Sequence, residues 1–307
     1  MTNGSFGDGD PIIAVVGAGS WGTAFANALA HKGLKVMLWA RRQQLAEEIL
    51  TKHLNPDYLP GIYLSPRLRA TSEIEAAVER AHVVVMAIPT KAFRDVLQSA
   101  AKHIRPRAPI VSLAKGLELE SLKRMSQVMA EEIEASGPSG PRGPERIAVL
   151  SGPNLAKEIA MGQPAASVIA CEDLSTADML QELFMTPIFR TYSDHDIVGV
   201  EIGGILKNVI AIAAGIADGV GFGANTKATV ITRGLAEMKR LGVRLGADPL
   251  TFSGLAGVGD LICTCMSPLS RNNQVGSALG QGRKIDEILA GMRQVAEGVN
   301  ASKAVKE

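Results

Sequence analysis

The sequence predicts an α/β protein: a Rossmann-like, doubly wound, mostly parallel sheet at the N-terminus, followed by a second, all-α C-terminal domain. Short apolar runs rich in β-branched residues alternate with helical patterns over the first two-thirds of the 307 residues. Such alternation is typical of a parallel sheet with right-handed crossovers and helices on both faces. Beyond about residue 195 no strong strand pattern remains. We therefore expect one domain over residues 1–195 and a helical domain over 196–307.

The individual elements follow from apolar periodicity and from turn-forming residues between them. Strands are expected at 12–17, 35–40, 82–89, 146–152, 165–171 and 188–193, and a strand followed by a loop at 108–116. Helices are expected at 21–33, 43–53, 72–80, about 90–103, about 121–135, 154–161, 174–184, 196–219 and 225–246. Ser72 is the expected N-cap of the third helix. The Pro-rich stretch 55–68 and the Gly- and Pro-rich stretch 136–144 are expected to be loops.

Composition argues against several classes of partner. Hydrophobic residues make up 46% and charged residues 21%, the mix of a soluble globular protein. The formal net charge is +1 and aromatics are only 4%, so nothing favours nucleic acid or an anionic membrane. The apolar run 201–220 resembles a membrane span, but Glu201, Lys207, Asp218 and four glycines favour a buried helix instead.

Cysteine and histidine usage indicates a reduced compartment and no metal centre. The three cysteines are an odd number, and two are only one residue apart, so a disulfide framework is not expected. The five histidines show no metal-ligand spacing. The first residues are acidic and Gly-rich, unlike a secretory signal. We expect a cytoplasmic protein.

The stretch VVGAGSWG carries a G-x-G-x-x-G motif at Gly17, Gly19 and Gly22. The motif alone also fits an ordinary strand–helix turn. Here it follows an apolar strand and opens a helix inside a βαβ unit, which favours dinucleotide binding. Gly17 would permit the turn, Gly19 the approach of the pyrophosphate, and Gly22 the packing of helix on strand. The helix N-terminus would supply N–H groups and partial positive charge.

The second strand ends in LWARR, where an NAD-preferring enzyme usually has an acidic residue. Arg41 and Arg42 stand there, and a guanidinium binds a 2′-phosphate that a carboxylate would repel. We expect NADP(H) to be favoured, with NAD(H) still usable. The alternative is that both arginines are solvated surface charges.

Lys207 lies in the middle of the apolar run 201–220, where folding alone gives little reason to bury an ammonium group. In a helix it shares a face with Gly203 and Gly204, and these glycines are expected to leave room for a small substrate or a nicotinamide ring. The alternatives are a lysine that extends to the surface or pairs with a carboxylate.

Three further stretches carry candidate site residues. Lys115 in SLAKGLE follows a strand, at the edge where doubly wound sheets bind ligands. Asp260 follows a cluster of glycines at 254, 257 and 259 that is expected to be too irregular for a stable helix. Ser270, Arg271 and the asparagines after them suit bidentate binding of a phosphate or carboxylate. Each of the three stretches also has an ordinary structural interpretation. Lys115 could be a loop lysine, Asp260 an aspartate in a turn, and Ser270 and Arg271 the polar start of a helix.

Taken together, the chain resembles the bacterial-type NAD(P)-dependent glycerol-3-phosphate dehydrogenase family over nearly its whole length. The resemblance rests on GAGSWGTA, NPDYLPGIYL, SLAKGLE, LSGPNLAKEIA, EIGGILKNVIAIAAGI, NTKATVITRGLAEM, GLAGVGDLICTC, SRN and VAEGV, in this order. It implies reduction of dihydroxyacetone phosphate to sn-glycerol 3-phosphate in the cytosol, which supplies the glycerol backbone of phospholipids. It also implies a homodimer. The first domain would then bind the dinucleotide and the second the substrate.

The resemblance implies roles residue by residue. Lys207 would donate and accept the proton, with Lys115 and Asp260 beside it in the catalytic group. The implied substrate-binding residues are Lys115, Gly152, Asn154, Lys207, Asp260, Ser270, Arg271 and Asn272. The implied cofactor-binding residues, with the motif glycines, are Ser20, Trp21, Arg41, Arg42, Lys115, Ala156, Arg271, Val295 and Glu297.

The chain departs from the family pattern at two places. Many relatives have Ser or Thr where this chain has Asn154, so a hydroxyl contact is not expected there. The chain ends at ASKAVKE within a predicted helix, without the family's final helices, and weaker folding or dimerisation is the expected result.

The expected chemistry is hydride transfer to a ketone, with Lys207 as general acid and Arg271 as clamp on the substrate phosphate. Burial and Lys115 would lower the pKa of Lys207, and Asp260 would oppose them. Two alternatives remain from the residues alone. One is a 3-hydroxyacid or 6-phosphogluconate type dehydrogenase of the same architecture. The other is a dinucleotide sensor without catalysis, which would have no need of Lys207, Asp260 and Arg271.

Overall fold

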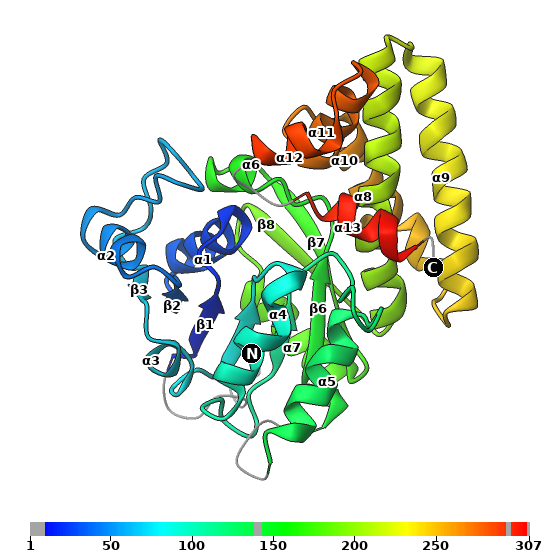
Figure 1. The fold of residues 1–307 in the computed structure, drawn as a ribbon. Coiled ribbons are helices and arrows are strands. Elements are labelled where there is room, and N and C mark those ends of the chain that lie inside the picture. Colours follow the sequence, from blue (N-terminus) through cyan, green and yellow to red (C-terminus); the bar gives the residue numbers. More distant parts are fainter. Residues whose placement is uncertain (1–9, 138–142, 293–295, 306–307) are drawn as a thin grey trace.

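The structure, a computed structural model, describes residues 10–137, 143–292 and 296–305. Its centre is an eight-stranded sheet in the order β3-β2-β1-β4-β5-β6-β7-β8 (Figure 1). The strands are β1 Ile12–Val16, β2 Lys35–Trp39, β3 Arg69–Thr71, β4 Val83–Met86, β5 Ile110–Ser112, β6 Ile147–Ser151, β7 Ala165–Cys171 and β8 Phe189–Asp194. Neighbouring strands pair in parallel except β6 and β7. The predicted mostly parallel, doubly wound sheet is confirmed.

Helices cover both faces of this sheet. They are α1 Ser20–Lys32, α2 Gln43–Lys52, α3 Ile74–Val78, α4 Thr90–Ala101, α5 Met125–Ala135, α6 Ala156–Ala160 and α7 Leu174–Phe184. Along β1 the side chains alternate, as the pleat requires. Ile13 packs in one core with Phe25 of α1, and Ala14 packs in another with Phe93 of α4. Both faces of the strand are therefore buried, which explains its unbroken apolar sequence.

The C-terminal part is helical, as predicted. It consists of α8 Ile197–Val220, α9 Ala224–Arg244, α10 Asp260–Met266, α11 Arg271–Gly280, α12 Ile285–Ala290 and α13 Glu297–Ala304. Figure 1 shows these helices gathered to one side of the sheet, around α8. Helix α8 is long and apolar enough to cross a membrane, with a mean hydropathy of 1.8, but 72% of that window is buried inside the protein. It is the core helix of this domain.

Helices α8 and α11 approach each other closely because both carry glycine at the contact. A Cβ at Gly215 would lie 2.2 Å from the carbonyl oxygen of Asn273, and one at Gly276 would lie 2.1 Å from that of Ile212. Larger residues at either position would push the two helices apart. The glycines of α8 therefore fit helix packing, and they allow α11 to lie directly against α8.

Glu201 joins α8 to the sheet domain. Its carboxylate accepts hydrogen bonds from the Ser126 backbone N–H at 2.8 Å, from the Ser126 hydroxyl at 2.6 Å and from Arg124 at 2.5 Å. Burial raises the pKa of Glu201, and the Arg124 charge opposes this effect. Its place in an apolar run is thus explained by partners at the start of α5, since a buried carboxylate needs them.

Four local expectations were wrong. The sheet has an additional strand, β3, at its edge after the Pro-rich loop. The N-cap of α3 is Glu73 rather than Ser72, without a side-chain cap. Helix α5 begins at Met125, because Leu117 pairs with Arg124 in an isolated bridge and Leu122 has a φ of 56°. The glycines before Asp260 form a π-helical turn over Leu255–Gly259 that leads directly into α10.

The two motif glycines at 19 and 22 permit a matched test of packing. A Cβ at Gly22 would lie 2.0 Å from the carbonyl oxygen of Gly17, whereas one at Gly19 would meet nothing within 4 Å. We expect Gly22→Ala to lower the free energy of unfolding by ~1–3 kcal/mol. Gly19→Ala is expected to lower it by less than about 1 kcal/mol, the size of an N-cap effect. Urea unfolding followed by circular dichroism measures both, and equal losses would contradict the assigned packing.

Candidate active site

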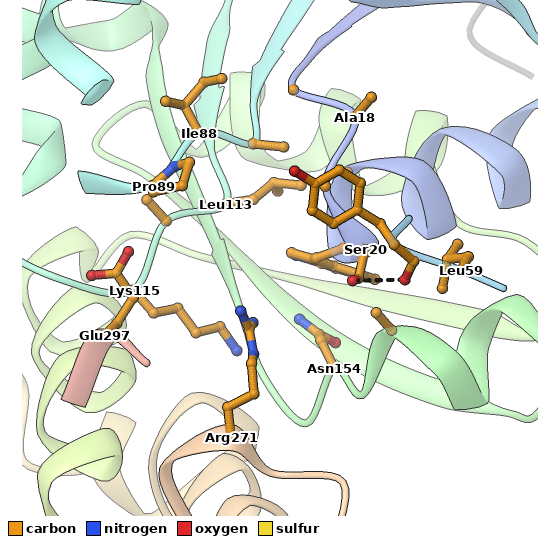
Figure 2. Close-up of a pocket in the computed structure, with 18 of the residues that line it drawn as sticks. Ala18, Ser20, Leu59, Ile88, Pro89, Leu113, Lys115, Asn154, Arg271 and Glu297 are labelled. Atoms are coloured by element: carbon orange, nitrogen blue, oxygen red, sulfur yellow. Dashed lines mark hydrogen bonds between the residues drawn. The ribbon is translucent and has the colours of Figure 1, made fainter. Parts of the chain in front are cut away.

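A cavity of about 630 Å³ lies where the carboxyl ends of β1 and β4 face the helical domain. Clefts at this switch point of the strand order are where doubly wound sheets bind ligands. Fifteen of the sequence-predicted site residues line it: Gly17, Gly19, Ser20, Trp21, Gly22, Arg41, Arg42, Lys115, Asn154, Ala156, Lys207, Ser270, Arg271, Asn272 and Glu297. They come from both domains, as Ser20 and Arg271 illustrate in Figure 2. Val295 lies outside the described residues.

The glycine motif forms one end of the cavity. Gly17 has a φ of 121°, and a Cβ there would lie 2.4 Å from the carbonyl oxygen of Ala87 on the neighbouring strand. Gly22 packs against the carbonyl oxygen of Gly17, as the motif predicts. Gly19 is the N-cap of α1 and leaves open space beside it. The N-terminus of α1 thus faces the cavity without a side chain from its N-cap, an arrangement suited to an anion.

The Pro-rich loop 55–68 covers this end. The Ser20 hydroxyl donates to the carbonyl oxygen of Tyr58 at 2.9 Å, and the buried Asn55 amide donates to Ala18 at 3.0 Å. Trp21 packs on Phe25 and Phe189, and its Nε1 is buried without a hydrogen-bond partner among the described residues. Asn55 and Tyr58 were not predicted as site residues, although Asn-Pro signals a turn.

The two arginines after β2 differ in their surroundings. Arg42 forms an ion pair with Asp57 from the Pro-rich loop. Arg41 is exposed at the cavity and forms no ion pair within the described part of the chain. A guanidinium that is not already paired is the better candidate for an external anion. Arg41 is thus the stronger candidate of the two.

A buried charge cluster lies at the other end of the cavity. The Asp260 carboxylate, only 1% exposed, accepts a hydrogen bond from Lys115 Nζ and another from Lys207 Nζ, each at 2.7 Å. Lys207 also donates to the Thr264 hydroxyl at 2.7 Å. The cluster joins the loop after β5 to α8 and α10. Thr264 was not predicted, but it stands four residues after Asp260 and therefore on the same helix face.

The cluster carries one net positive charge when all three groups are ionised. Burial lowers the pKa of Lys115 to about 8, although the Asp260 carboxylate acts in the opposite direction. Burial alone would raise the pKa of Asp260, but the charges of Lys115 and Lys207 outweigh it and hold that pKa below its usual value. Asp260 therefore stays ionised and keeps both ammonium groups in place.

The expectation that Gly203 and Gly204 leave room for a ligand was wrong. A Cβ at Gly203 would lie 2.4 Å from the carbonyl oxygen of Ala256, and one at Gly204 would lie 2.9 Å from the Ser151 hydroxyl. Protein atoms from the π-helical turn and from β6 already occupy that space. The glycines allow α8 to lie against these elements, while Lys207 lines the same cavity as Arg271.

A chain of amide side chains holds the cluster in position. Asn208, next to Lys207, donates to the carbonyl oxygen of Lys115 at 3.1 Å and accepts from Asn272 at 2.8 Å. Asn272 accepts in turn from the Gly298 N–H at 3.0 Å. Lys115 Nζ also donates to the carbonyl oxygen of Gly152 at 2.8 Å. Gly152 thus contacts the cluster through its backbone, without lining the cavity.

Arg271 lies between this cluster and the glycine motif. Figure 2 shows its guanidinium group pointing into the cavity near Lys115 and Asn154. Surrounding protein lowers the pKa of Arg271, while the Glu297 carboxylate raises it. Ser270 is the N-cap of α11 and accepts from the Asn273 N–H at 3.2 Å. Its hydroxyl therefore already serves the helix that carries Arg271.

Glu297, the first residue of α13, connects this helix to the sheet domain at the cavity. Its carboxylate accepts from the Thr90 hydroxyl at 3.0 Å and from the Thr90 N–H at 3.3 Å, at the start of α4. Burial raises the pKa of Glu297 despite these bonds. Together with the Lys115–Asp260 ion pair, this contact joins the two domains beside the cavity.

The arrangement can bind an anion at two places and protonate an oxygen between them. The α1 N-terminus and Arg41 suit one phosphate-bearing ligand, and Arg271 with the lysines suits a second, smaller one. A buried ammonium group beside a ligand stabilises negative charge that develops on it. No group of three potential His, Cys, Asp or Glu metal ligands occurs in the described ranges.

Comparison with known protein families gives matches over both domains. Residues 12–177 match the family model for the N-terminus of NAD-dependent glycerol-3-phosphate dehydrogenase, and residues 196–307 match the model for its C-terminus. The two matches together span most of the chain. They agree with the resemblance seen in the sequence motifs.

Individual relatives of high sequence identity belong to the same family. A glycerol-3-phosphate dehydrogenase [NAD(P)+] from Thermobifida fusca is 52% identical over 296 residues, which is 96% of this chain and 86% of that protein. One from Corynebacterium glutamicum (strain R) is 53% identical over 294 residues, covering 95% and 86%.

Solved structures agree in fold. The glycerol-3-phosphate dehydrogenase of Coxiella burnetii has a TM-score of 0.89 at 37% identity, over 97% of this chain and 88% of its own. A ketopantoate reductase from Ralstonia eutropha, at a TM-score of 0.57 and 15% identity over 96% and 97% of the two chains, shares the fold alone. This chain therefore belongs to the NAD-dependent glycerol-3-phosphate dehydrogenase family, and it is an oxidoreductase that uses a nicotinamide cofactor and a small-molecule substrate.

Proposed function

We propose that this chain reversibly reduces dihydroxyacetone phosphate to sn-glycerol 3-phosphate with NAD(P)H, in the direction that serves glycerophospholipid synthesis. The observation that carries the proposal is the buried Lys115–Asp260–Lys207 cluster, which faces Arg271 across one cavity. Dihydroxyacetone phosphate carries a ketone and a phosphate on a three-carbon chain. Its reduction therefore needs a proton donor near the ketone oxygen and a cationic group near the phosphate, within one cavity. Oxidation of NADPH on addition of dihydroxyacetone phosphate, repeated with NADH, tests the activity directly.

The described residues fit a dinucleotide. The open space beside Gly19 and the N-terminus of α1 would receive the pyrophosphate, since both the steric and the electrostatic requirements are met there. Trp21, Ala156, Glu297 and Lys115 line the path from that end toward the charge cluster. When bound, the nicotinamide supplies the hydride that reduces the ketone.

Lys207 would act as general acid and base. During reduction the carbonyl oxygen of the substrate gains negative charge, and an ammonium group beside it stabilises this charge and then donates a proton. Asp260 and Thr264 hold Nζ by two hydrogen bonds, so the third N–H is left for the substrate. In the reverse direction the neutral amine would accept the proton of the alcohol.

Lys115 and Asp260 would complete the catalytic group. With a pKa of about 8, Lys115 is largely protonated at neutral pH and contributes positive charge to the substrate oxygens. Asp260 would keep the two ammonium groups from separating. Arg271, with Ser270 and Asn272 supporting its helix, would bind the substrate phosphate and so position the ketone. Asn154 would complete the wall on the sheet side, and Gly152 would act through its carbonyl oxygen, which accepts from Lys115.

We further propose NADP(H) as the favoured cofactor, because Arg41 is exposed at the end of β2, where a 2′-phosphate would lie. Arg42 would help less, since Asp57 already pairs with it.

We also propose a division of the chain at residues 195/196, a homodimer, and action in the cytosol. The odd number of cysteines, two of them one residue apart, supports a reduced compartment.

Replacement of the proposed proton donor is expected to lower the turnover rate by orders of magnitude. Lys207→Met removes the ammonium group, and we expect kcat to fall roughly 10²–10⁴-fold for the lost general acid. NADPH binding, followed by its fluorescence, should persist. Lys227→Met is the control, because Lys227 pairs with Asp218 outside the cavity. Near-normal turnover of Lys207→Met would refute the assignment.

Replacement of the proposed phosphate clamp is expected to depend on the substrate. We expect Arg271→Ala to lower kcat/KM for dihydroxyacetone phosphate by about 10²-fold or more, because a charge-assisted bidentate contact is lost. Activity on unphosphorylated dihydroxyacetone should change far less. Steady-state kinetics on the two ketones separates the outcomes, and equal losses would identify Arg271 as a structural residue.

Reversal of charge at Arg41 is expected to change the cofactor preference. In Arg41→Asp the new carboxylate would repel a 2′-phosphate and accept from a ribose hydroxyl, so KM for NADPH should rise while KM for NADH does not. Arg42→Asp is the comparison, and a smaller effect is expected because of Asp57. An unaltered ratio of the two KM values in Arg41→Asp would remove the proposed preference.

A further inference from the structure

The Asn154 side chain carries an N–H donor without a hydrogen-bond partner among the described residues, in the part of the cavity near Arg271 and Lys115. The donor atom is Nδ2, which is buried. Figure 2 shows the side chain pointing into the cavity on the same side as the Arg271 guanidinium and the Lys115 ammonium. A buried N–H without a partner costs stability unless a ligand or water satisfies it. The position therefore indicates a contact with an acceptor atom of a ligand.

The other end of the Asn154 amide is held by Ser167. The Ser167 hydroxyl donates to Asn154 Oδ1 at 2.6 Å, from a residue in β7 that is 0% exposed. A carboxamide has an acceptor end and a donor end, so a bond that occupies Oδ1 turns Nδ2 the other way. Ser167 lies beneath the loop that carries Asn154 and does not line the cavity.

We propose that Ser167 is a positioning residue, which fixes the orientation of the Asn154 amide so that Nδ2 donates to an oxygen atom of the substrate. The proposal rests on the proposed function, because the acceptor is taken to be an oxygen of dihydroxyacetone phosphate or glycerol 3-phosphate. Ser167 itself would touch neither substrate nor cofactor. Its effect would pass only through Asn154.

The packing of the segment 152–154 on β7 explains how Ser167 can reach the Asn154 amide. A Cβ at Gly152, which has a φ of 149°, would lie 2.9 Å from Ser167 Cα and 3.0 Å from its hydroxyl. The chain between Gly152 and Asn154 therefore lies directly on β7. A hydroxyl on the adjacent strand can reach Oδ1 there, and a rigid strand holds it more accurately than a loop would.

The experiment compares Ser167→Ala with the wild type in steady-state kinetics. We expect KM for dihydroxyacetone phosphate to rise about 3- to 10-fold, the range of one hydrogen bond, with kcat little changed. KM for NADPH should stay at the wild-type value. Thr191→Val is the matched control, because Thr191 is paired in register with Ser167, is also 0% exposed, and donates instead to Gln181. It removes a buried hydroxyl without any link to Asn154, so its KM should not change.

A double-mutant cycle distinguishes positioning from a general loss of structure. In an Asn154→Ala background the amide is gone, so Ser167→Ala should have no further effect on KM. An equal rise of KM in both backgrounds, a wild-type KM in Ser167→Ala, the same rise in Thr191→Val, or a rise in KM for NADPH instead would each overturn the proposal. Failure of the wild type to oxidise NADPH with dihydroxyacetone phosphate would instead reject the proposed function.

Discussion

The carboxylate of Asp260 is the group on which the architecture of the site depends. Two ammonium groups from different parts of the chain, Lys115 after β5 and Lys207 in the middle of α8, lie within 2.7 Å of its oxygens. Burying an isolated charge costs several kcal/mol, and two like charges side by side would cost more. One buried carboxylate between them offsets that cost and leaves a single net positive charge. It also fixes where the helical domain meets the sheet domain.

This constraint explains why an apolar core helix carries a lysine. Helix α8 is the centre of the C-terminal domain, so any side chain on its inner face is held by packing on several sides. A cation at such a place is poorly hydrated and acts strongly on nearby oxygen atoms, since the local dielectric is low. The surrounding contacts, from Asn208 to Asn272 and from Glu297 to Thr90, all join elements that are distant in sequence. They hold the walls of the cavity together, while Lys115 and Lys207 still line it.

Much of the fold followed from local patterns. The packing at Gly17 and Gly22 agrees with the motif, because carbonyl oxygens of Ala87 and Gly17 lie where Cβ atoms of the two glycines would have to fit. The alternation of strands and helices predicted the order of elements. The errors occurred where a neighbour distant in sequence decides the outcome: β3 exists because β2 offers an edge, and the space beside Gly204 is filled by Ser151 from β6.

The sequence by itself determined the periodicity of each element, the phosphate-binding turn and the residue types of the charge cluster, because these depend on neighbours within a few positions along the chain. Only the tertiary structure decided which of those charges meet. Asp260 and Lys115 are 145 residues apart, and Ser167 in β7 reaches Asn154 in the loop after β6. Local propensity contains no information on such contacts. They arise because packing the sheet against α8 brings the ends of β5 and β6 to the same point as α10 and α11.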